Sequence, residues 1–265
     1  MKKTIKILFI FLVSFSVVHA DEYLLQEMES LKSSLDKNDP DRGELSLRLA
    51  DLYFDVSIQE ASDGNIVENR EKALKLYSDV LYGRDGLKKA SDKAAAKIRF
   101  QIARVLGKLN RISDSKKYYK NVFEDDLSSK KFKRESALAL AEFYEEDVNF
   151  KMSDKYYSHG IELCESKESC NYAHYKRAWL LYKEVRLDDA IAELKKSLWD
   201  SKGQARDKVI KDILLFFSAL ETDGHNELIY IAELSSKINQ PELVRMLVEA
   251  FYGAGNRVAG SNVLV

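Results

Sequence analysis

The sequence predicts an all-α fold, a right-handed superhelical solenoid of antiparallel helix pairs. Small residues followed by bulky ones recur along the chain at intervals of 34 to 42 residues, and a period of this length is typical of stacked helical repeats. The chain has only 2 prolines and 11 glycines in 265 residues, too few for a turn-rich β protein. Its length also exceeds that of one compact core, a limit that solenoids avoid because each repeat packs only on its neighbours.

Residues 1–20 have the features of a secretory signal peptide. Lys2, Lys3 and Lys6 form a positive start, an apolar run follows, and small residues precede the expected cleavage after Ala20. The alternative is an uncleaved membrane anchor, but the apolar run of about twelve residues is shorter than the roughly 20 needed to span a bilayer. We therefore expect an exported protein that lies in the periplasm or associates with the outer membrane through its partners.

Residues 21–40 are expected to form an N-terminal capping helix. Apolar side chains recur at helical spacing along one side of this segment, at Leu24, Leu25, Met28, Leu31 and Leu35. Pro40 then favours a helix end and a new start. The repeat domain is predicted to cover residues 41–265, with about five to six helix pairs, of which the last is incomplete.

Within the repeat domain, the first helix of each pair carries a small residue three or four positions before a bulky one. These spacings place both side chains on one face of a helix. The small residue lets the partner helix approach, and the bulky one fills the space between repeats. The pairs are Ala50 with Tyr53, Ala103 with Leu106, Ala141 with Tyr144, and Ala178 with Tyr182.

The second helix of each pair carries a matching signal, in which a small residue precedes an aromatic residue or a leucine by four positions. The predicted anchors are Ala73 with Tyr77, Ser115 with Tyr119, Ser153 with Tyr157, Ala190 with Leu194, and Asn226 with Tyr230, and Gly260 begins a sixth. The alternative is a bundle of ordinary amphipathic helices. Four first helices in phase, each followed by such an anchor, favour repeats.

These residues resemble the tetratricopeptide repeat (TPR) family over residues 41–265. The matching positions are Ala141, Tyr144, Ser153, Tyr157 and Gly160 in one repeat, Ala178, Ala190, Leu194 and Ser197 in the next, and Phe251, Gly255 and Gly260 near the C-terminus. The sequence departs from the family at Val148 and Val185, where a small residue is usual, and it lacks the proline that closes each repeat. The resemblance implies a groove that binds other proteins.

In the TPR family, side chains of the first helices line the inner groove. The resemblance places Arg104, Lys108, Glu142, Glu145, Tyr172, Tyr175, Trp179, Tyr182 and Lys183 there. One interpretation is a set of solvated faces whose charges pair between neighbouring repeats, and the other is a segmented groove for an extended or helical peptide. The four aromatic residues are the best candidates for binding energy, unless two of them simply pack against the adjacent helix.

Cys164 and Cys170 are the only cysteines. In an exported protein so close a pair can form a disulfide that staples the turn, unless the local geometry keeps the sulfurs apart. Neither this spacing nor that of His159, His174 and His225 matches a metal site. We therefore expect no metal and no cofactor.

No nucleophile elbow, phosphate-binding loop or dinucleotide-binding motif occurs in the sequence. The balance of 42 basic and 43 acidic residues argues against a nucleic-acid partner, and no integral membrane segment is expected after signal cleavage. The expected function is a non-enzymatic scaffold or adaptor that binds envelope proteins, with its oligomeric state open. The alternatives are a structural, oligomerising component of an envelope complex and a cell-wall-acting enzyme on a helical scaffold.

Overall fold

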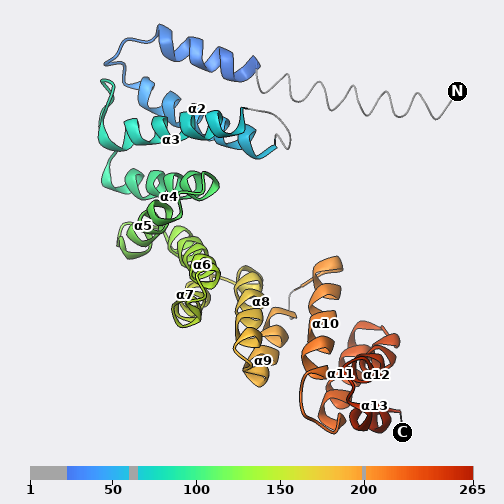
Figure 1. Cartoon of the computed structure of the whole chain (residues 1–265). Coiled ribbons are helices and arrows are strands. Elements are labelled where there is room, and N and C mark those ends of the chain that lie inside the picture. The colour runs from blue at the N-terminus through green and yellow to red at the C-terminus, as the bar shows by residue number, and fades with distance from the viewer. Residues whose placement is uncertain (1–22, 60–64, 199–200, 265) are drawn as a thin grey trace, which may run out of the picture. The chain divides into compact units, whose positions relative to one another are not determined.

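The computed structural model describes residues 23–59, 65–198 and 201–264, without the side chains of 167–169, and these ranges contain helices and no strand (Figure 1). The predicted signal peptide lies outside the described residues. A first helix covers residues 23–34. The helices that follow are α2 (Asp41–Gln59), α3 (Ile66–Tyr82), α4 (Asp92–Lys108), α5 (Ile112–Glu124), α6 (Lys130–Glu146), α7 (Phe150–Glu162), α8 (Lys167–Lys183), α9 (Leu187–Leu198), α10 (Gly203–Ser218), α11 (His225–Ile238), α12 (Glu242–Gly253) and α13 (Arg257–Val263). The prediction of an all-α chain is confirmed for this part of the protein.

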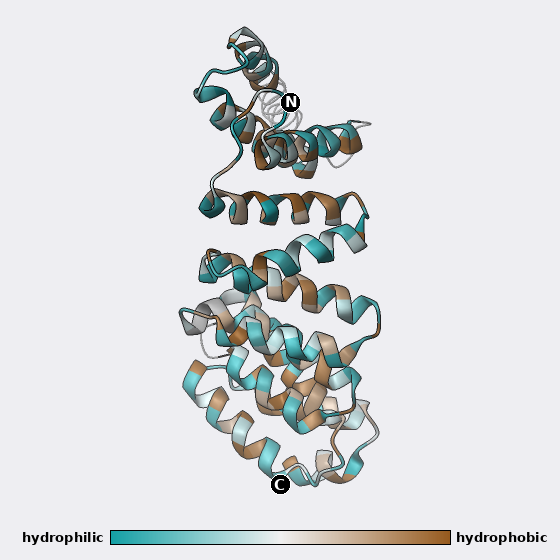
Figure 2. Ribbon diagram, turned by 90° about the vertical axis from the view of Figure 1, so that its left-hand side faces the viewer, coloured by the Kyte–Doolittle hydropathy of each residue, from teal (hydrophilic) through white to brown (hydrophobic). Residues whose placement is uncertain are grey.

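The chain divides into two compact units, with the boundary between Phe132 and Lys133. In the first unit α2 packs on α3, α3 on α4 and α4 on α5; in the second, consecutive helices from α7 to α10 pack on one another, and α12 contacts α10, α11 and α13. Hydrophobic and hydrophilic residues alternate along individual helices (Figure 2). Most of these helices have an apolar side that they bury against neighbouring helices, as the repeat pattern predicts.

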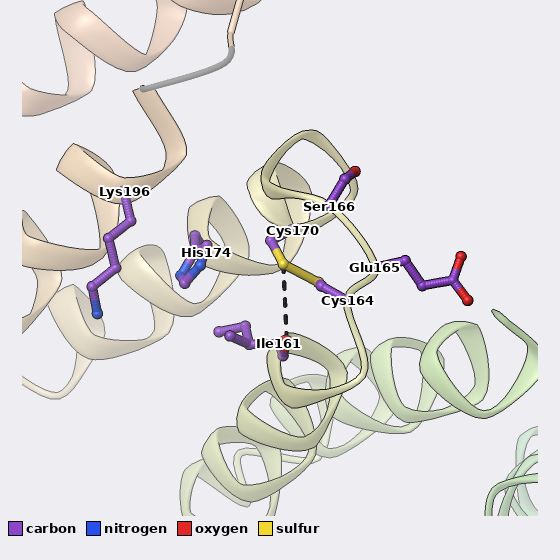
Figure 3. A pocket seen from close by; sticks show the side chains of 7 residues that line it. All are labelled: Ile161, Cys164, Glu165, Ser166, Cys170, His174 and Lys196. Atoms are coloured by element: carbon purple, nitrogen blue, oxygen red, sulfur yellow. Dashed lines mark hydrogen bonds between the residues drawn. A yellow bond between two sulfur atoms is a disulfide. The ribbon is translucent and has the colours of Figure 1, made fainter. Parts of the chain in front are cut away.

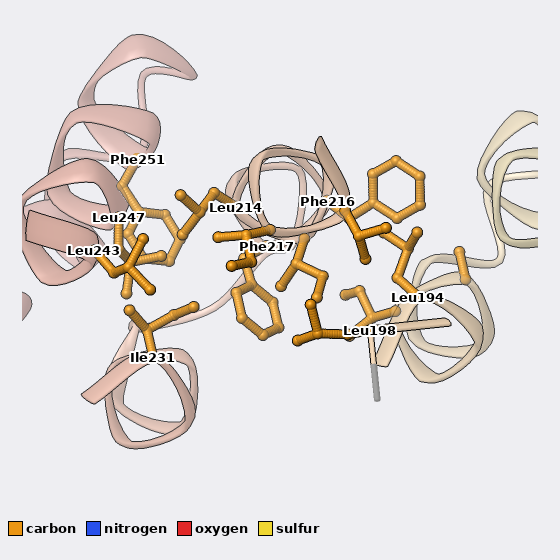
Figure 4. Close-up of a cluster of buried hydrophobic side chains, with 14 of the residues drawn as sticks. Leu194, Leu198, Leu214, Phe216, Phe217, Ile231, Leu243, Leu247 and Phe251 are labelled. Carbon is orange, nitrogen blue, oxygen red and sulfur yellow. The ribbon is translucent and has the colours of Figure 1, made fainter. Parts of the chain in front are cut away.

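Each unit has its own hydrophobic cluster. In the first unit, the fully buried side chains include those of Phe54 and Tyr77 from α2 and α3. In the second, side chains from α9, α10, α11 and α12 converge, with Leu194, Phe216 and Phe251 completely buried (Figure 4). The second cluster is continuous across successive helix pairs, which is how a repeat fold builds a core without a single compact centre.

Small residues mark the closest approach of the two helices in a pair. Ala103 and Ser115, twelve positions apart, are both fully buried, and the serine hydroxyl donates a hydrogen bond of 2.7 Å to the alanine carbonyl. Ala141 and Ser153 repeat this contact at 2.9 Å. Each buried serine hydroxyl thus has a hydrogen-bond partner, and these four predicted small residues lie where the paired helices contact each other.

The turn within four of the pairs contains one residue in the left-handed conformation. These residues are Asn110, Val148, Val185 and Gly255, with φ of 59°, 59°, 62° and 83°. In each case the next residue donates its N–H to a carbonyl five positions earlier, at 2.8 to 2.9 Å, which is the Schellman arrangement at a helix end. In two of these turns, at Val148 and Val185, the left-handed residue is a valine, whose branched side chain is sterically disfavoured in this conformation.

We expect Val185→Gly to stabilise the protein by roughly 0.5–1 kcal/mol, because relief of about 1–2 kcal/mol of strain outweighs the backbone entropy cost of glycine. The Val185 side chain is 78% exposed, so little packing is lost. The midpoint of thermal unfolding should rise. As a control, Ala192→Gly on an exposed helical position of α9 should lower it; a fall in both variants would contradict the strain argument.

The expected opening helix is present over residues 23–34. Leu25 is buried and Met28 and Leu35 are half-buried, whereas Leu24 and Leu31 are exposed. One predicted anchor is wrong. In α11 the predicted anchor Asn226 is exposed, and the buried positions are Glu227 and Ile231, one residue later. The connection from α10 to α11 has six residues, against three in the turns before α5, α7, α9 and α13, and it enters α11 through Gly224 at φ 87°.

Candidate functional site

In the second unit, the first helices α6 and α8 are joined by polar contacts between repeats. The hydroxyl of Tyr172 donates a hydrogen bond to Glu142, and the ammonium group of Lys176 lies 3.6 Å from the same carboxylate. Tyr172 itself is 53% exposed. The predicted residues Glu142 and Tyr172 are therefore neighbours on one surface, with an accessible aromatic ring beside a carboxylate.

A second junction of the same kind lies about one turn further along α6, at Glu145, and about two turns further along α8, at Lys183. Lys183 Nζ is 2.5 Å from Glu145 Oε1, and the Tyr157 hydroxyl donates to Glu145 Oε2 at 2.9 Å. Burial, together with the negative charge of Glu145, raises the pKa of Tyr157 far above its usual range, so the phenol stays a neutral donor. Half of the Lys183 side chain remains exposed, and its charge is partly available to a ligand.

The other three predicted aromatic residues pack against the next repeat. The Tyr175 hydroxyl donates to Asp212 Oδ2 at 2.8 Å, and the Trp179 indole N–H approaches the same oxygen at 3.3 Å. The Tyr182 ring stacks on Phe216 with centroids 4.3 Å apart. These side chains are half-buried, so they stabilise the junction between α8 and α10.

Arg104 and Lys108, the two predicted groove residues of the first unit, have different surroundings. The Arg104 guanidinium lies 4.9 Å from the centroid of the Phe54 ring and donates to Gln101 at 2.9 Å. Such a cation–π contact holds the arginine against α2. The Lys108 side chain is exposed, and its backbone carbonyl accepts a hydrogen bond from Arg70 at 2.8 Å.

A buried charged network behind this surface was not predicted from the sequence. Glu193 in α9 is only 6% exposed, and its carboxylate contacts His174 Nδ1 at 2.5 Å, Lys196 at 2.8 Å and Arg177 at 3.3 Å. Arg177 also binds Asp154 of α7 at 2.7 Å. Burial opposes ionisation of Glu193, but hydrogen bonds from His174 and Lys196 outweigh it and lower its pKa to about 2. The network ties α7, α8 and α9 together.

Cys164 and Cys170 are bonded to each other, with their Cα atoms 5.6 Å apart, within the usual range for a disulfide. Cys164 follows α7 and Cys170 lies in α8, so the bond joins the end of one helix pair to the start of the next. The two cysteines line a cavity of about 570 Å³ together with His174 and Lys196, and Figure 3 shows these side chains and the disulfide.

The described part of the chain contains no group of three or more His, Cys, Asp or Glu side chains arranged to hold a metal ion. Among the helices described, none combines the length and apolar character required of a membrane span.

Comparisons with known proteins support the fold and leave the family open. No family model matches the sequence, and no curated protein matches it. Among solved structures, the protein is similar to BtubC (BKLC) from P. vanneervenii, with a TM-score of 0.52 and 14% identity over 93% of this chain and 89% of that one. It is also similar to a putative kinesin light chain with nearly identical TPR-like repeats from Podospora anserina, with a TM-score of 0.52 and 12% identity over 83% and 99% of the two chains.

The chain has a TPR-like repeat fold. The predicted fold class is thereby confirmed, and it is one that commonly serves protein interaction. At 12–14% identity the likeness concerns the fold alone and assigns no role to any surface residue.

Proposed function

We propose that this protein is an exported, non-enzymatic TPR scaffold or adaptor of the cell envelope, with residues 41–265 as its repeat domain. The proposed docking surface, which we name the α6–α8 face, consists of Glu142, Glu145, Tyr172, Lys176 and Lys183. The TPR-like fold and the leader-like residues 1–20 support this proposal, as does the disulfide, a bond typical of oxidising compartments.

The observation that carries the proposal is the position of Tyr172. The residue is 53% exposed, while its hydroxyl donates a hydrogen bond to Glu142. An aromatic side chain fixed in this way loses little entropy when a partner covers it. The two neighbouring carboxylates each face a lysine, so the face offers both signs of charge. A helix or extended peptide with an apolar anchor and mixed charges would complement it.

A photocrosslink tests this function directly. We expect a photoreactive phenylalanine derivative at position 172 to give a discrete adduct with a partner protein in cells. The matched control is position 155, an exposed lysine on the second helix α7, which should give no such adduct. Equal labelling at both positions, or no adduct at position 172, would contradict docking on the α6–α8 face. An adduct only with a second copy of this chain would favour the oligomerising alternative.

A further inference from the structure

A second cavity lies between α9, α10 and α11. Its volume is about 590 Å³, within the range of pockets that hold small ligands. The lining residues are Lys195, Leu198, Ser201, Arg206, Tyr230, Glu233, Leu234, Lys237 and Ile238. None of them belongs to the α6–α8 face, so this cavity is a separate site.

Four apolar or aromatic residues form much of the wall of this cavity. Leu198 belongs to the buried core, and Tyr230, Leu234 and Ile238 are half-buried against it. Figure 4 shows Leu198 at the α9 side of that core. A wall of this kind excludes water from an apolar ligand and gains the free energy of its burial. The interior therefore suits an alkyl chain or a ring.

The charged groups of the cavity are mostly cationic. Lys195, Arg206 and Lys237 line it, against a single acidic residue, Glu233. The Lys195 ammonium group lies 4.1 Å from the centroid of the Tyr230 ring and 5.3 Å from that of Phe217, contacts that hold the cation at the edge of the apolar wall. This excess of positive charge favours an anionic ligand.

Arg206 supplies a hydrogen-bond donor without an acceptor. Its Nε atom is shielded from solvent, and within the described residues it has no hydrogen-bond partner. Buried polar groups are nearly always hydrogen-bonded, so an unpaired buried donor indicates a site for a ligand or a water molecule. The guanidinium group prefers carboxylate or phosphate oxygens, which accept two parallel hydrogen bonds from it.

We infer that this cavity binds a small amphiphilic anion, with its apolar chain among Leu198, Tyr230, Leu234 and Ile238 and its carboxylate at Arg206 and Lys195. The apolar wall selects the chain, and the two cations select the charged end. Ligand binding in this cavity uses no residue of the α6–α8 face and is independent of partner docking there.

Calorimetry with free laurate on the full-length mature protein tests the assignment, with dodecanol as the neutral probe of equal chain length. We expect laurate to bind one site and dodecanol to bind about tenfold more weakly, since it offers no charge to the guanidinium. Arg206→Gln should weaken laurate about tenfold and leave dodecanol unchanged. The matched control is Lys211→Gln, an exposed position on the same helix α10 that does not line the cavity.

Any of three results with laurate would overturn the assignment. These are no laurate binding to the wild-type protein, equal loss in the Arg206 and Lys211 variants, and laurate binding that is unchanged by Leu234→Asp, which places a charge in the apolar wall. Phosphatidylglycerol vesicles test the other source of the same chemistry, a membrane lipid. Sedimentation of the protein with vesicles that depends on Arg206, without binding of free laurate, would also overturn it. Circular dichroism of each variant establishes that it is folded.

Discussion

Replacing Phe216 by alanine is expected to lower the free energy of unfolding by about 3–5 kcal/mol, the range found for large buried aromatic residues. Phe216 is fully buried, stacks on Tyr182 at 4.3 Å and meets the edge of Trp179 at 5.1 Å. Its loss leaves a cavity at the junction between α8 and α10, where neighbouring repeats hold each other. Urea unfolding followed by circular dichroism measures the change.

The adjacent residue supplies the control for this experiment. Leu215 is on the same helix but 44% exposed, so Leu215→Ala should cost less than about 1 kcal/mol. Similar losses for the two variants would mean that the aromatic contacts do not make the junction. Because repeat proteins can unfold in parts, the Phe216 variant should also show a first transition that removes the C-terminal helices before the rest.

The repeat pattern was predictable because close approach of two helices demands small side chains at fixed positions. Ala103 and Ser115 are separated by the same interval as Ala141 and Ser153, and all four are buried at the contact. Such positions are recognisable in one sequence, since any larger residue would force the backbones apart. In α11 the interval no longer applies, and the buried positions lie one residue after the predicted anchor Asn226.

Periodicity could not predict which aromatic side chains of α8 are exposed and which are packed. The spacing places Tyr172, Tyr175, Trp179 and Tyr182 on α8, but whether each is buried depends on contacts from the neighbouring repeat. Asp212 of α10 accepts hydrogen bonds from Tyr175 and Trp179, and this contact joins residues 33 and 37 positions apart. Only Tyr172 stays largely open, because its partner is on the preceding repeat and its ring is not covered.

The buried carboxylate was missed for a related reason. Glu193 lies three positions after Ala190 and directly before Leu194, both fully buried, so its position in α9 signals burial. Charged residues on helices are usually solvated, so Glu193 was not predicted to be buried. The three cationic or imidazole partners that make burial tolerable come from α8 and from the next turn of α9, and only the structure brings them together.

Replacing Glu193 by glutamine is accordingly expected to destabilise the protein by about 2–4 kcal/mol at pH 7, because removal of one partner leaves the others buried without their counter-charge. Glutamine keeps the volume but accepts weaker hydrogen bonds from His174, Arg177 and Lys196. The matched control is Glu162→Gln, which removes an exposed carboxylate 3.2 Å from His159; a pair of this kind contributes typically under about 1 kcal/mol.

The dependence on pH distinguishes loss of the charge from loss of packing. The pKa of Glu193 is about 2 in the folded protein, against an ordinary value of 4.5. A carboxyl group with a depressed pKa stabilises the fold fully above its unfolded pKa, and this contribution is lost as the pH falls through the folded value. The difference between wild-type and Glu193→Gln unfolding free energies should therefore be constant above about pH 5 and shrink from there towards pH 2. A difference that stays constant to pH 2 would assign the effect to packing, and the charged network would then not be what joins α7, α8 and α9.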